Sequence, residues 1–255
     1  MAGRKRSLKP KTSLVVVSYN GYEVTKKCLD SIFRNSGDSS LYEVILVDNA
    51  STDESKSRLI TRYANRSNFS CVSLNSNTFL TAAYNAGFMK SRADVLVFMN
   101  NDTTMTPQWL DKILSKFESK SVGIVGVSLL SGKSPDYIDS QGCSLNVLGY
   151  GFRINSGKKY SQKLEMEEPF FIAGSVLAVR RNLFQKTGMF DEAYDGNYED
   201  VDLAWRIRLL GYSIEVAYDA IVYHYGSWSV AKFFDAHHSS YLCRKNRLMT
   251  LLKNG

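Results

Sequence analysis

Four short apolar runs alternate with helical patterns in the first half of the chain, and this alternation constrains the fold more than any other feature. The runs lie at residues 13–18, 42–47, 69–74 and 94–99. Between them, apolar residues recur three or four positions apart, as on the buried face of a helix. Strands that alternate with helices form parallel sheets through right-handed crossovers. We therefore predict an α/β fold with a parallel sheet, to which residues 122–130 add a fifth strand.

The helices of this half are expected at residues 21–35, after Asp53, at 81–92, and at 107–118, where Pro107 after Thr106 marks a first turn. The pattern then loosens. Residues 131–168 are rich in Gly, Ser and Lys without a clear period, which predicts irregular structure or a small hairpin. Beyond them we predict a strand at 170–179, a helix at 200–210 that Gly211 ends, extended segments at 212–217 and 220–223, and a helix over 230–252.

The charge of the chain is concentrated at its ends. Of the net +7, residues 1–12 carry +5 and residues 241–255 carry +4, which leaves −2 for the residues between. We expect residues 1–12 to be a basic, flexible tail and residues 13–255 to form a single domain. The basic ends suit weak attachment to an anionic membrane surface better than specific binding of nucleic acid.

The remaining composition is that of an ordinary globular protein, with 44% hydrophobic and 22% charged residues. No apolar stretch approaches the roughly 20 residues that a membrane span needs, and none follows the basic N-terminus as in a secretory signal. The four cysteines lie far apart without metal-type spacing, which indicates free thiols in a reducing compartment. We therefore expect a cytoplasmic protein, peripheral to the membrane if attached to it.

Polar clusters follow three of the apolar runs. The fourth run ends in residues 100–102, Asn-Asn-Asp, and similar clusters stand at 18–20 and 48–53. Carboxyl ends of parallel strands meet at one edge of a sheet, where ligands bind in open α/β folds. Carboxylates at this edge can accept hydrogen bonds from a nucleotide or hold a divalent cation. Asp48 suits such a role, whereas Asp53 is better placed to cap the following helix.

A second group of ionisable residues lies in the later half. Glu199, Asp200 and Asp202 crowd the start of a predicted helix. The helix dipole favours anions there, but three acids in four positions exceed what a cap requires, and a carboxylate at a site can act as a general base. His224 stands between two tyrosines, a setting typical of a structural histidine unless the fold places it beside Asp102.

Short motifs follow one another in a specific order along the chain. They are Val16–Asn20 (VVSYN), Val47–Asp53 (VDNASTD), Asn77–Gly87, Met99–Asp102 (MNND), Phe171–Ser175 (FIAGS), Gly188–Glu192 (GMFDE), Glu199–Leu203 (EDVDL), Tyr223–His224 and Tyr241–Leu248. Through this ordered set the chain resembles the inverting glycosyltransferases of family 2, most closely their rhamnosyltransferase-like and galactofuranosyltransferase-like branch. The resemblance runs from about Ser13 to Leu252.

The resemblance implies a GT-A fold, which is a Rossmann-like domain with a mostly parallel central sheet flanked by helices, a smaller acceptor-side sheet and a C-terminal helix. It divides the domain into a nucleotide-sugar-binding half (13–130) and an acceptor-binding and catalytic half (131–255). It also implies metal-dependent, inverting transfer of a sugar, such as rhamnose or another hexose, from a UDP- or dTDP-sugar. The acceptor would be a hydroxyl of a glycan or a lipid-linked molecule in the synthesis of polysaccharide or cell-surface glycan.

The same resemblance assigns roles to individual side chains. Asp200 is the expected catalytic base, and Asp102 and His224 are the expected ligands of Mn²⁺ or Mg²⁺. Glu199, Asp202 and Trp228 are expected to contact the acceptor or support the site. The expected nucleotide-sugar contacts are Ser18, Tyr19, Asn20, Asp48, Asn77, Asn85, Asn100 and Asn101.

Two positions depart from the family pattern. Asn100 replaces the first aspartate of the metal motif, so Asp102 is its remaining carboxylate. Phe79, Thr81 and Ala82-Ala83 stand where glycines or other small residues are usual, which bears on the choice of donor sugar. A sugar nucleotidyltransferase is one alternative, but it needs a Gly-rich loop with a cation after the first strand. A catalytically silent binding module is another; Asn100 permits it, and the retained acids and histidine oppose it.

Overall fold

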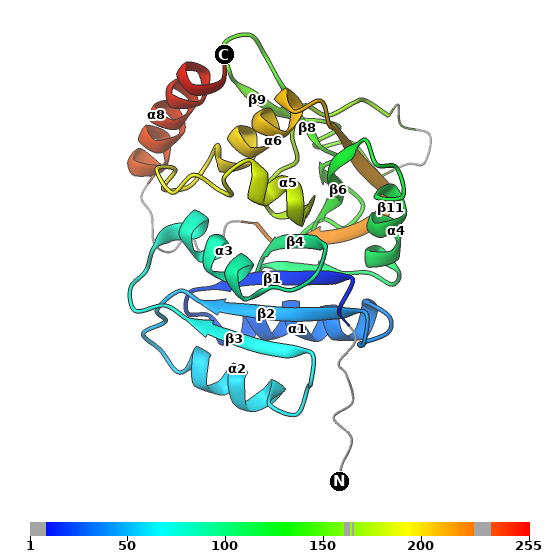
Figure 1. Cartoon of the computed structure of the whole chain (residues 1–255), viewed down its shortest axis with the longest axis vertical. Helices are drawn as coiled ribbons and strands as arrows, with labels where there is room; N and C mark the ends of the chain where they lie inside the picture. The colour runs from blue at the N-terminus through cyan, green and yellow to red at the C-terminus, as the bar shows by residue number, and fades with distance from the viewer. Residues whose placement is uncertain (1–8, 161–163, 165, 227–235) are drawn as a thin grey trace.

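The computed structural model describes residues 9–160, 164, 166–226 and 236–255, with side chains from residue 240 onward in the last range. Its elements are, in chain order, β1 (Thr12–Ser18), α1 (Tyr22–Asn35), β2 (Tyr42–Asp48), α2 (Ser55–Tyr63), β3 (Phe69–Ser73), α3 (Phe79–Lys90), β4 (Val95–Asn100), β5 (Thr103–Met105), α4 (Trp109–Lys116), β6 (Val122–Ser131), β7 (Ile138–Ser140), β8 (Cys143–Leu145), β9 (Gly151–Arg153), β10 (Val176–Arg180), α5 (Arg181–Lys186), α6 (Glu199–Leu209), β11 (Ser213–His224) and α8 (Ala236–Asn254). The main sheet has the order β3-β2-β1-β4-β10-β6-β11-β5, with β7 beside β6. Figure 1 shows β3, β2 and β1 side by side, with β4 beyond β1.

The first half of the sheet is parallel, as the alternation of strands and helices predicts. β1 lies between β2 and β4, and β3 extends the sheet beyond β2. Helices cover both faces, so successive residues of a strand enter different cores. In β1, Leu14 and Val16 pack on the side of α1, α2 and α4, whereas Val15 and Val17 pack on the side of α3, α5 and α6. Figure 1 shows α1 and α3 on opposite faces of β1 and β2.

An antiparallel strand interrupts this parallel order. β10 lies between β4 and β6 and is antiparallel to both. The sequence predicts a strand over 170–179, but β10 begins only at Val176, and Phe171 makes only an isolated bridge to Cys143. The backbone directly before Val176 lies outside β10, and there the Gly174 amide donates a hydrogen bond to the Asp200 carboxylate instead of to a strand. β6 therefore does not pair with β4 but with β10 and, in parallel, with β11.

The predicted start of the fourth helix is wrong by two residues. The helix begins at Trp109 rather than Pro107, because Gln108 adopts a left-handed φ of 62°. Thr106 is meanwhile held to β11 by its backbone amide and its hydroxyl. The short β5 precedes it and pairs with β11, so the chain leaves β4 through an edge strand before it turns into α4.

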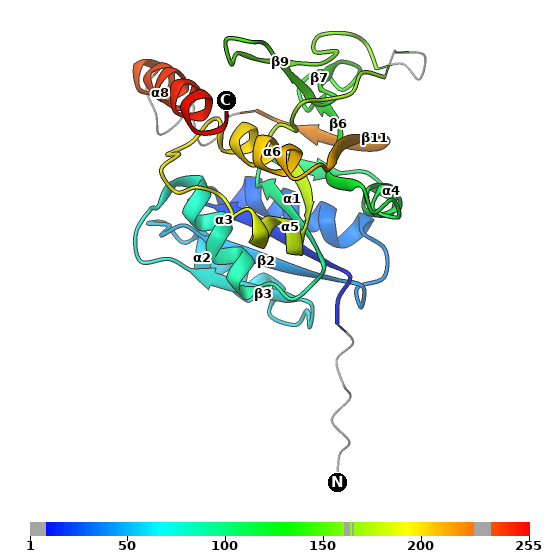
Figure 2. The same ribbon diagram turned by 45° about the horizontal axis from the view of Figure 1, so that its top comes forward.

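The second half combines strands from distant parts of the chain. The hairpin predicted within 131–168 is confirmed by β8 and β9, which form a separate two-stranded sheet. The segments predicted at 212–217 and 220–223 form one strand, β11, whose register shifts after Ala217. α8 packs against α6 at the end of the molecule that also holds the hairpin (Figure 2). In the part of the chain that the structure describes, no helix is both long and apolar enough to cross a membrane.

Candidate active site

The polar clusters after β1, β2 and β4 lie together at the carboxyl edge of the sheet, as predicted. Ser18 pairs with Asp48 across β1 and β2, and Asn100 pairs with Val17 across β4 and β1. Asp48 is almost fully buried and its carboxylate accepts a hydrogen bond from the Ser51 amide. The Ser18 hydroxyl binds Thr25 rather than facing outward. Ser18 therefore shapes the start of α1, and Asp48 shapes the loop after β2.

Side-chain amides hold the loops of this edge in place. The Asn20 Oδ1 accepts hydrogen bonds from the backbone amides of Thr52 and Asp53, which joins the loop after β1 to the loop after β2. Asn49 joins the loop after β2 to the start of α3, because its side chain binds Asn77 and the backbone at the N-terminus of that helix. These contacts leave a prearranged rim around Tyr19, which is half-buried.

Unusual backbone conformations concentrate in the same loops. Asn20, Ala50 and Phe79 have positive φ angles of 55°, 62° and 59°, although none is glycine. Residues held in this region cost free energy and cluster at binding and catalytic sites. Asn197 and Tyr198, directly before α6, share the feature with φ angles of 61° and 70°. Five of the eight non-glycine positions with positive φ among the described residues thus lie in the loops after β1 and β2, at the start of α3 and directly before α6.

The turn after β4 presents its two amides in different ways. Burial raises the pKa of Tyr84, so its phenol stays protonated and donates to the Asn100 Oδ1 at 3.0 Å. This hydrogen bond uses one of the two lone pairs of the Asn100 Oδ1 and fixes the orientation of the amide. Asn101 is buried and donates to the Thr25 hydroxyl, which anchors the turn to α1.

Asp102 and His224 lie side by side although 121 positions separate them in the sequence. The His224 Nε2 is 3.5 Å from the Asp102 Oδ1, and both side chains are buried. β11 pairs with β5 in the register His224 to Thr103, which brings the histidine to the turn after β4. A hydrogen bond from the Tyr225 amide to the Asp102 carbonyl continues this contact.

The other nitrogen of His224 has a carboxylate partner. Its Nδ1 is 2.8 Å from the Asp139 Oδ2, and Asp139 also pairs with Arg153. Although burial opposes it, the hydrogen bond with His224 and the charge of Arg153 lower the pKa of Asp139. An ionised Asp139 can only accept, so the Nδ1 carries a proton, and the Nε2 is the ring nitrogen on the side of Asp102.

Gly174 and Ser175 connect this pair to the acidic start of α6. The Ser175 hydroxyl is 3.4 Å from the His224 Nε2, and the Gly174 amide donates to the Asp200 Oδ2 at 2.9 Å. The Ser175 carbonyl also accepts from the Asn100 amide, which ties the segment to the end of β4. A Cβ at Gly174 would come within 3.2 Å of the Glu199 carboxyl. The small residue thus allows the segment and the two acids to approach closely.

Glu199 and Asp200 have different acidities. Burial, and to a smaller extent the neighbouring Asp200 charge, raises the pKa of Glu199 from 4.5 to about 8. Burial also raises the pKa of Asp200, but only to about 6, because the amides of Gly174 and Val201 stabilise its ionised form. At neutral pH the pair therefore holds one proton on Glu199, and Asp200 is the carboxylate that can accept a proton from an incoming hydroxyl.

Two predicted site residues have structural contacts. Asp202 is fully buried and pairs with Arg206 and Lys253, so it supports the junction of α6 and α8 rather than facing an acceptor. Asn85 binds the backbone of Phe190 through both ends of its amide, which fixes the loop after α5. Trp228 lies outside the described residues.

The residues present fit a divalent cation. No three His, Cys, Asp or Glu side chains converge on one point in the described part of the chain. Asp102 and His224 nevertheless offer one oxygen and one imidazole nitrogen, and Asp139 orients the imidazole as carboxylates do at many metal sites. Cations that bind nucleotides commonly take their remaining ligands from phosphates and water. Two protein ligands are therefore sufficient in the presence of a diphosphate.

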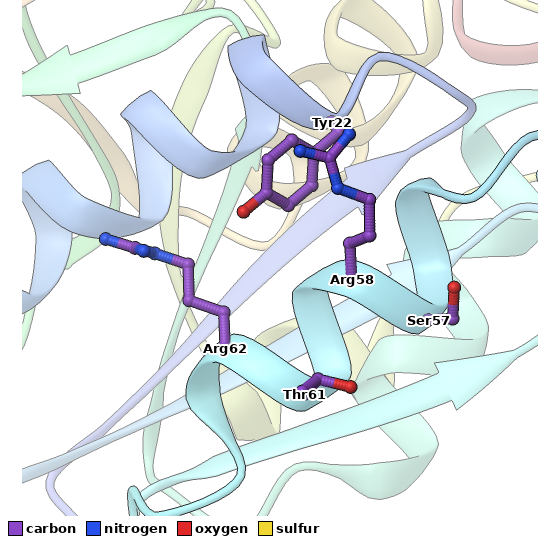
Figure 3. Close-up of a pocket in the computed structure, with 5 residues that line it drawn as sticks. All are labelled: Tyr22, Ser57, Arg58, Thr61 and Arg62. Atoms are coloured by element: carbon purple, nitrogen blue, oxygen red, sulfur yellow. The ribbon is translucent and has the colours of Figure 1, made fainter.

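A cavity of about 480 Å³ lies outside this group, between α1 and α2 (Figure 3). The Arg58 guanidinium stacks 3.6 Å from the Tyr22 ring, and Arg62 pairs with Asp30. The cavity is lined by Tyr22, Ser57, Arg58, Thr61 and Arg62. None of the acids or the histidine described above borders it, so we assign it no part in the site.

Comparison with known proteins fits this geometry. The sequence matches the glycosyl transferase family 2 over residues 13–188, which is more than half of the chain. The chain belongs to glycosyl transferase family 2. Among similar proteins, glycosyltransferase AglE of Haloferax volcanii is 27% identical over 226 residues, covering 84% of this chain and 67% of that protein. The O-antigen biosynthesis protein RfbC of Myxococcus xanthus is 24% identical over 86% of this chain, but the match covers only 18% of RfbC.

Solved glycosyltransferases share the fold. GalNAc-T7, solved with UDP, GalNAc and Mn²⁺, superimposes with a TM-score of 0.72 at 16% identity, over 85% of this chain and 44% of that one. The mannosyltransferase PcManGT from Pyrobaculum calidifontis, in complex with GDP-Man and Mn²⁺, gives a TM-score of 0.69 at 17% identity, over 97% of this chain and 66% of that one. The predicted GT-A fold is thereby confirmed. The rhamnosyltransferase-like or galactofuranosyltransferase-like branch remains a prediction.

Sequence reasoning missed several residues of this family 2 site. Asp139 and Arg153 lie in the stretch 131–168, which has no period to place them, and only the fold brings them to His224. Tyr84 lies in a largely apolar helical segment, and nothing in the sequence distinguishes it from an ordinary core aromatic residue. Ser175 ends the motif FIAGS, and that motif was the one signal that could have found it.

Proposed function

We propose that the chain is a metal-dependent, inverting glycosyltransferase that moves a sugar from a nucleoside-diphosphate sugar to an acceptor hydroxyl. The observation that carries the proposal is the Gly174–Ser175 segment, which joins Asp200 on one side to His224 and Asp102 on the other. A base and a binding site for a charged leaving group are thus held at opposite ends of one short segment. Direct displacement at a sugar carbon needs this arrangement.

Asp200 acts as the general base in this proposal. Its carboxylate takes the proton of the acceptor hydroxyl while the hydroxyl oxygen forms a bond to the anomeric carbon. The bond from that carbon to the diphosphate oxygen breaks, and the nucleoside diphosphate leaves from the opposite face. Glu199 keeps its proton at neutral pH and can donate a hydrogen bond to the acceptor. A well-placed base contributes about 10²–10⁴-fold to such a step.

Asp102 and His224 hold Mn²⁺ or Mg²⁺ in this proposal. When bound, the cation offsets the negative charge that grows on the diphosphate. The imidazole ligand favours Mn²⁺, since Mg²⁺ prefers oxygen, and related folds were solved with Mn²⁺. Asn100 then serves the ribose or a phosphate through its amide NH₂, while Tyr84 donates to its oxygen and holds the amide in place.

The donor loops supply the nucleotide contacts in this proposal. Tyr19, Asn20, Asp48 and Asn77 border one edge of the sheet, and residues 13–130 form the donor half. Solved relatives of the fold carry UDP, UDP-GlcNAc or GDP-Man, which supports a nucleotide sugar as donor. A UDP- or dTDP-sugar such as a rhamnose or another hexose donor follows from the family branch.

Residues 131–255 form the acceptor and catalytic half. We infer that the acceptor is a glycan or a lipid-linked molecule in the synthesis of polysaccharide or cell-surface glycan. We also infer a cytoplasmic protein that works at a membrane surface. The free thiols of all four cysteines support a reducing compartment, and the basic ends of the chain support contact with anionic lipid.

A donor screen tests the proposal. The purified chain is incubated with Mn²⁺ and UDP-, dTDP- or GDP-sugars, and release of the nucleoside diphosphate is measured with and without candidate acceptors. We expect release with one nucleotide class, and its loss in Asp200→Asn. Binding of a donor without any turnover across a broad acceptor panel would favour the silent binding module instead.

A further inference from the structure

The tip of the β8–β9 hairpin holds two large apolar side chains in solvent. Val147 is 95% exposed and Leu148 is 60% exposed. The turn that carries them is well ordered, because the Asn146 Oδ1 accepts hydrogen bonds from the amides of Leu148 and Tyr150. These hydrogen bonds fix the backbone of the turn in a conformation that leaves both side chains in solvent.

The outward face of α8 continues this apolar surface. Tyr241, Leu248 and Leu252 are exposed, Leu252 to 88%. They are spaced seven and four residues apart, which places them on one stripe of the helix. The opposite stripe, with Leu242, is buried against the domain. The solvent-facing side of a helix normally carries polar residues. On α8 this side carries large apolar residues instead.

Direct contacts join the hairpin tip and α8 into one rigid surface. The Arg247 side chain donates to the Leu148 carbonyl at 2.6 Å and lies 4.2 Å over the Tyr150 ring. Gly149 lies close to Leu251, whose side chain a Cβ there would meet at 3.0 Å. Figure 2 shows the hairpin and α8 at the same end of the molecule.

The surface is basic as well as apolar. Residues 143–153 and 236–255 contain Arg153, Arg244, Lys245, Arg247 and Lys253, and no acid. Three of these cations pair with acids elsewhere. Arg244 and Arg247 form no ion pair within the described residues, and Arg244 is exposed beside Leu248 on α8. Large apolar side chains flanked by unpaired cations complement the interface of an anionic bilayer.

We propose that the hairpin tip and the exposed stripe of α8 dock the protein on an anionic lipid bilayer. Val147, Leu148 and Leu252 enter the interface, and Arg244 contacts the lipid phosphates, while Arg247 holds the hairpin tip against α8. A protein partner would more often be met by polar groups distributed among the apolar ones, whereas residues 143–153 and 236–255 carry five cations and no acid, and neighbouring segments neutralise only three of these cations.

The docking surface is coupled to the site through Tyr198. Its hydroxyl donates to the Gly149 carbonyl at 3.0 Å, and it directly precedes Glu199 and Asp200. A bilayer under the hairpin would thus lie next to the acceptor half. This step rests on the proposed transferase function and gives the acceptor a class: a lipid-linked molecule whose head group is presented at the bilayer surface.

Vesicle binding tests the docking surface without donor or acceptor, so its outcome is independent of the transferase proposal. Sedimentation is compared on phosphatidylcholine vesicles and on vesicles of equal parts phosphatidylcholine and phosphatidylglycerol. We expect binding to the anionic vesicles that weakens as salt is raised. The double variant Val147→Ser, Leu148→Ser should bind about tenfold more weakly, and Arg244→Gln about fivefold more weakly.

Matched controls lie on other faces. Ile60→Ser with Met89→Ser removes two exposed apolar side chains from α2 and α3, and Lys120→Gln removes an exposed cation; these variants should bind like the parent. Equal binding of the hairpin variant and the parent would overturn the proposal. So would loss of binding on substitution of Arg4, Lys5 and Arg6 alone, which would assign attachment to the N-terminal tail. Self-association that the hairpin variant abolishes, with no lipid binding, would assign the surface to a second copy.

Discussion

At the residue scale, the site separates two neighbouring carboxyls by their surroundings. Glu199 is buried with little compensation, whereas Asp200 receives two backbone amides. Two neighbouring carboxyl groups thus differ in pKa, so that one can act as an acid and the other as a base.

Asp200→Asn is expected to reduce transfer by about 10²–10⁴-fold, because an amide cannot take the acceptor proton. Donor binding should persist, since the amide oxygen can still accept from Gly174. Turnover and nucleotide affinity are measured together. Asp195→Asn is the control, because that carboxylate pairs with Lys245 nearby. Near-normal turnover in Asp200→Asn would remove the residue from the role of base.

Glu199→Gln is expected to change how stability depends on pH. The folded-state pKa of Glu199 is raised, so its contribution to stability is complete below 4.5 and is lost as pH rises toward about 8. Glutamine carries no such dependence. The melting temperature of the variant relative to the parent should therefore increase over that range. Parallel melting curves for the two proteins across pH would contradict the burial argument.

Asp139→Asn is expected to weaken Mn²⁺ binding by about 10–100-fold, because the imidazole loses the carboxylate that fixes its tautomer. Mn²⁺ affinity is measured by titration in the presence of UDP, and the tautomer of His224 by nitrogen NMR. Asp136→Asn, close by in the chain, should leave both unchanged. An unaltered tautomer would show that Asp139 only neutralises Arg153.

At the element scale, apolar periodicity identified the helices and strands of the first half, because each buries a regular face. It did not identify β10 as antiparallel or place it between β4 and β6, since direction and neighbours leave no periodic trace. Gln108 likewise delays the start of α4 through its positive φ angle, which its residue type does not predict.

Gly87→Ala on α3 illustrates how an element is fixed by its packing. A Cβ at Gly87 would collide with Val15 of β1 and come within 3.0 Å of Val47 of β2. We expect a loss of about 1–3 kcal/mol in the free energy of unfolding, although alanine is the better helix former by about 1 kcal/mol. Chemical denaturation measures the change. Met89→Ala, at an exposed position of the same helix, should alter stability far less, and equal effects would refute the packing argument.

At the scale of the whole molecule, the site exists only where the two halves meet. Asp102 follows β4 in residues 13–130, and His224 ends β11 in residues 131–255. Asn246 of α8 contributes as well, because its side chain binds the carbonyls of Gly196 and Asn197 before α6.

His224→Ala is expected to raise the Mn²⁺ concentration needed for activity and for thermal stabilisation by UDP with Mn²⁺. Binding to the folded state stabilises it by mass action, so the loss of one ligand should shift the stabilisation curve to higher Mn²⁺. Differential scanning fluorimetry follows this shift. Tyr223→Phe on the same strand is the control. An unchanged Mn²⁺ dependence in His224→Ala would return His224 to a structural role.

The sequence by itself determined the α/β class, the parallel first half and the polar ends of β1, β2 and β4, because those features follow from local periodicity and from the geometry of parallel strands. Its ordered motifs also indicated family 2. Only the tertiary structure decided that Asp139 and Arg153 lie next to His224 and that Asp202 and Asn85 make structural contacts. It also decided that the Gly174–Ser175 segment connects Asp200 to His224. These contacts join residues from distant segments, and such proximity depends on strand order, which no local pattern encodes.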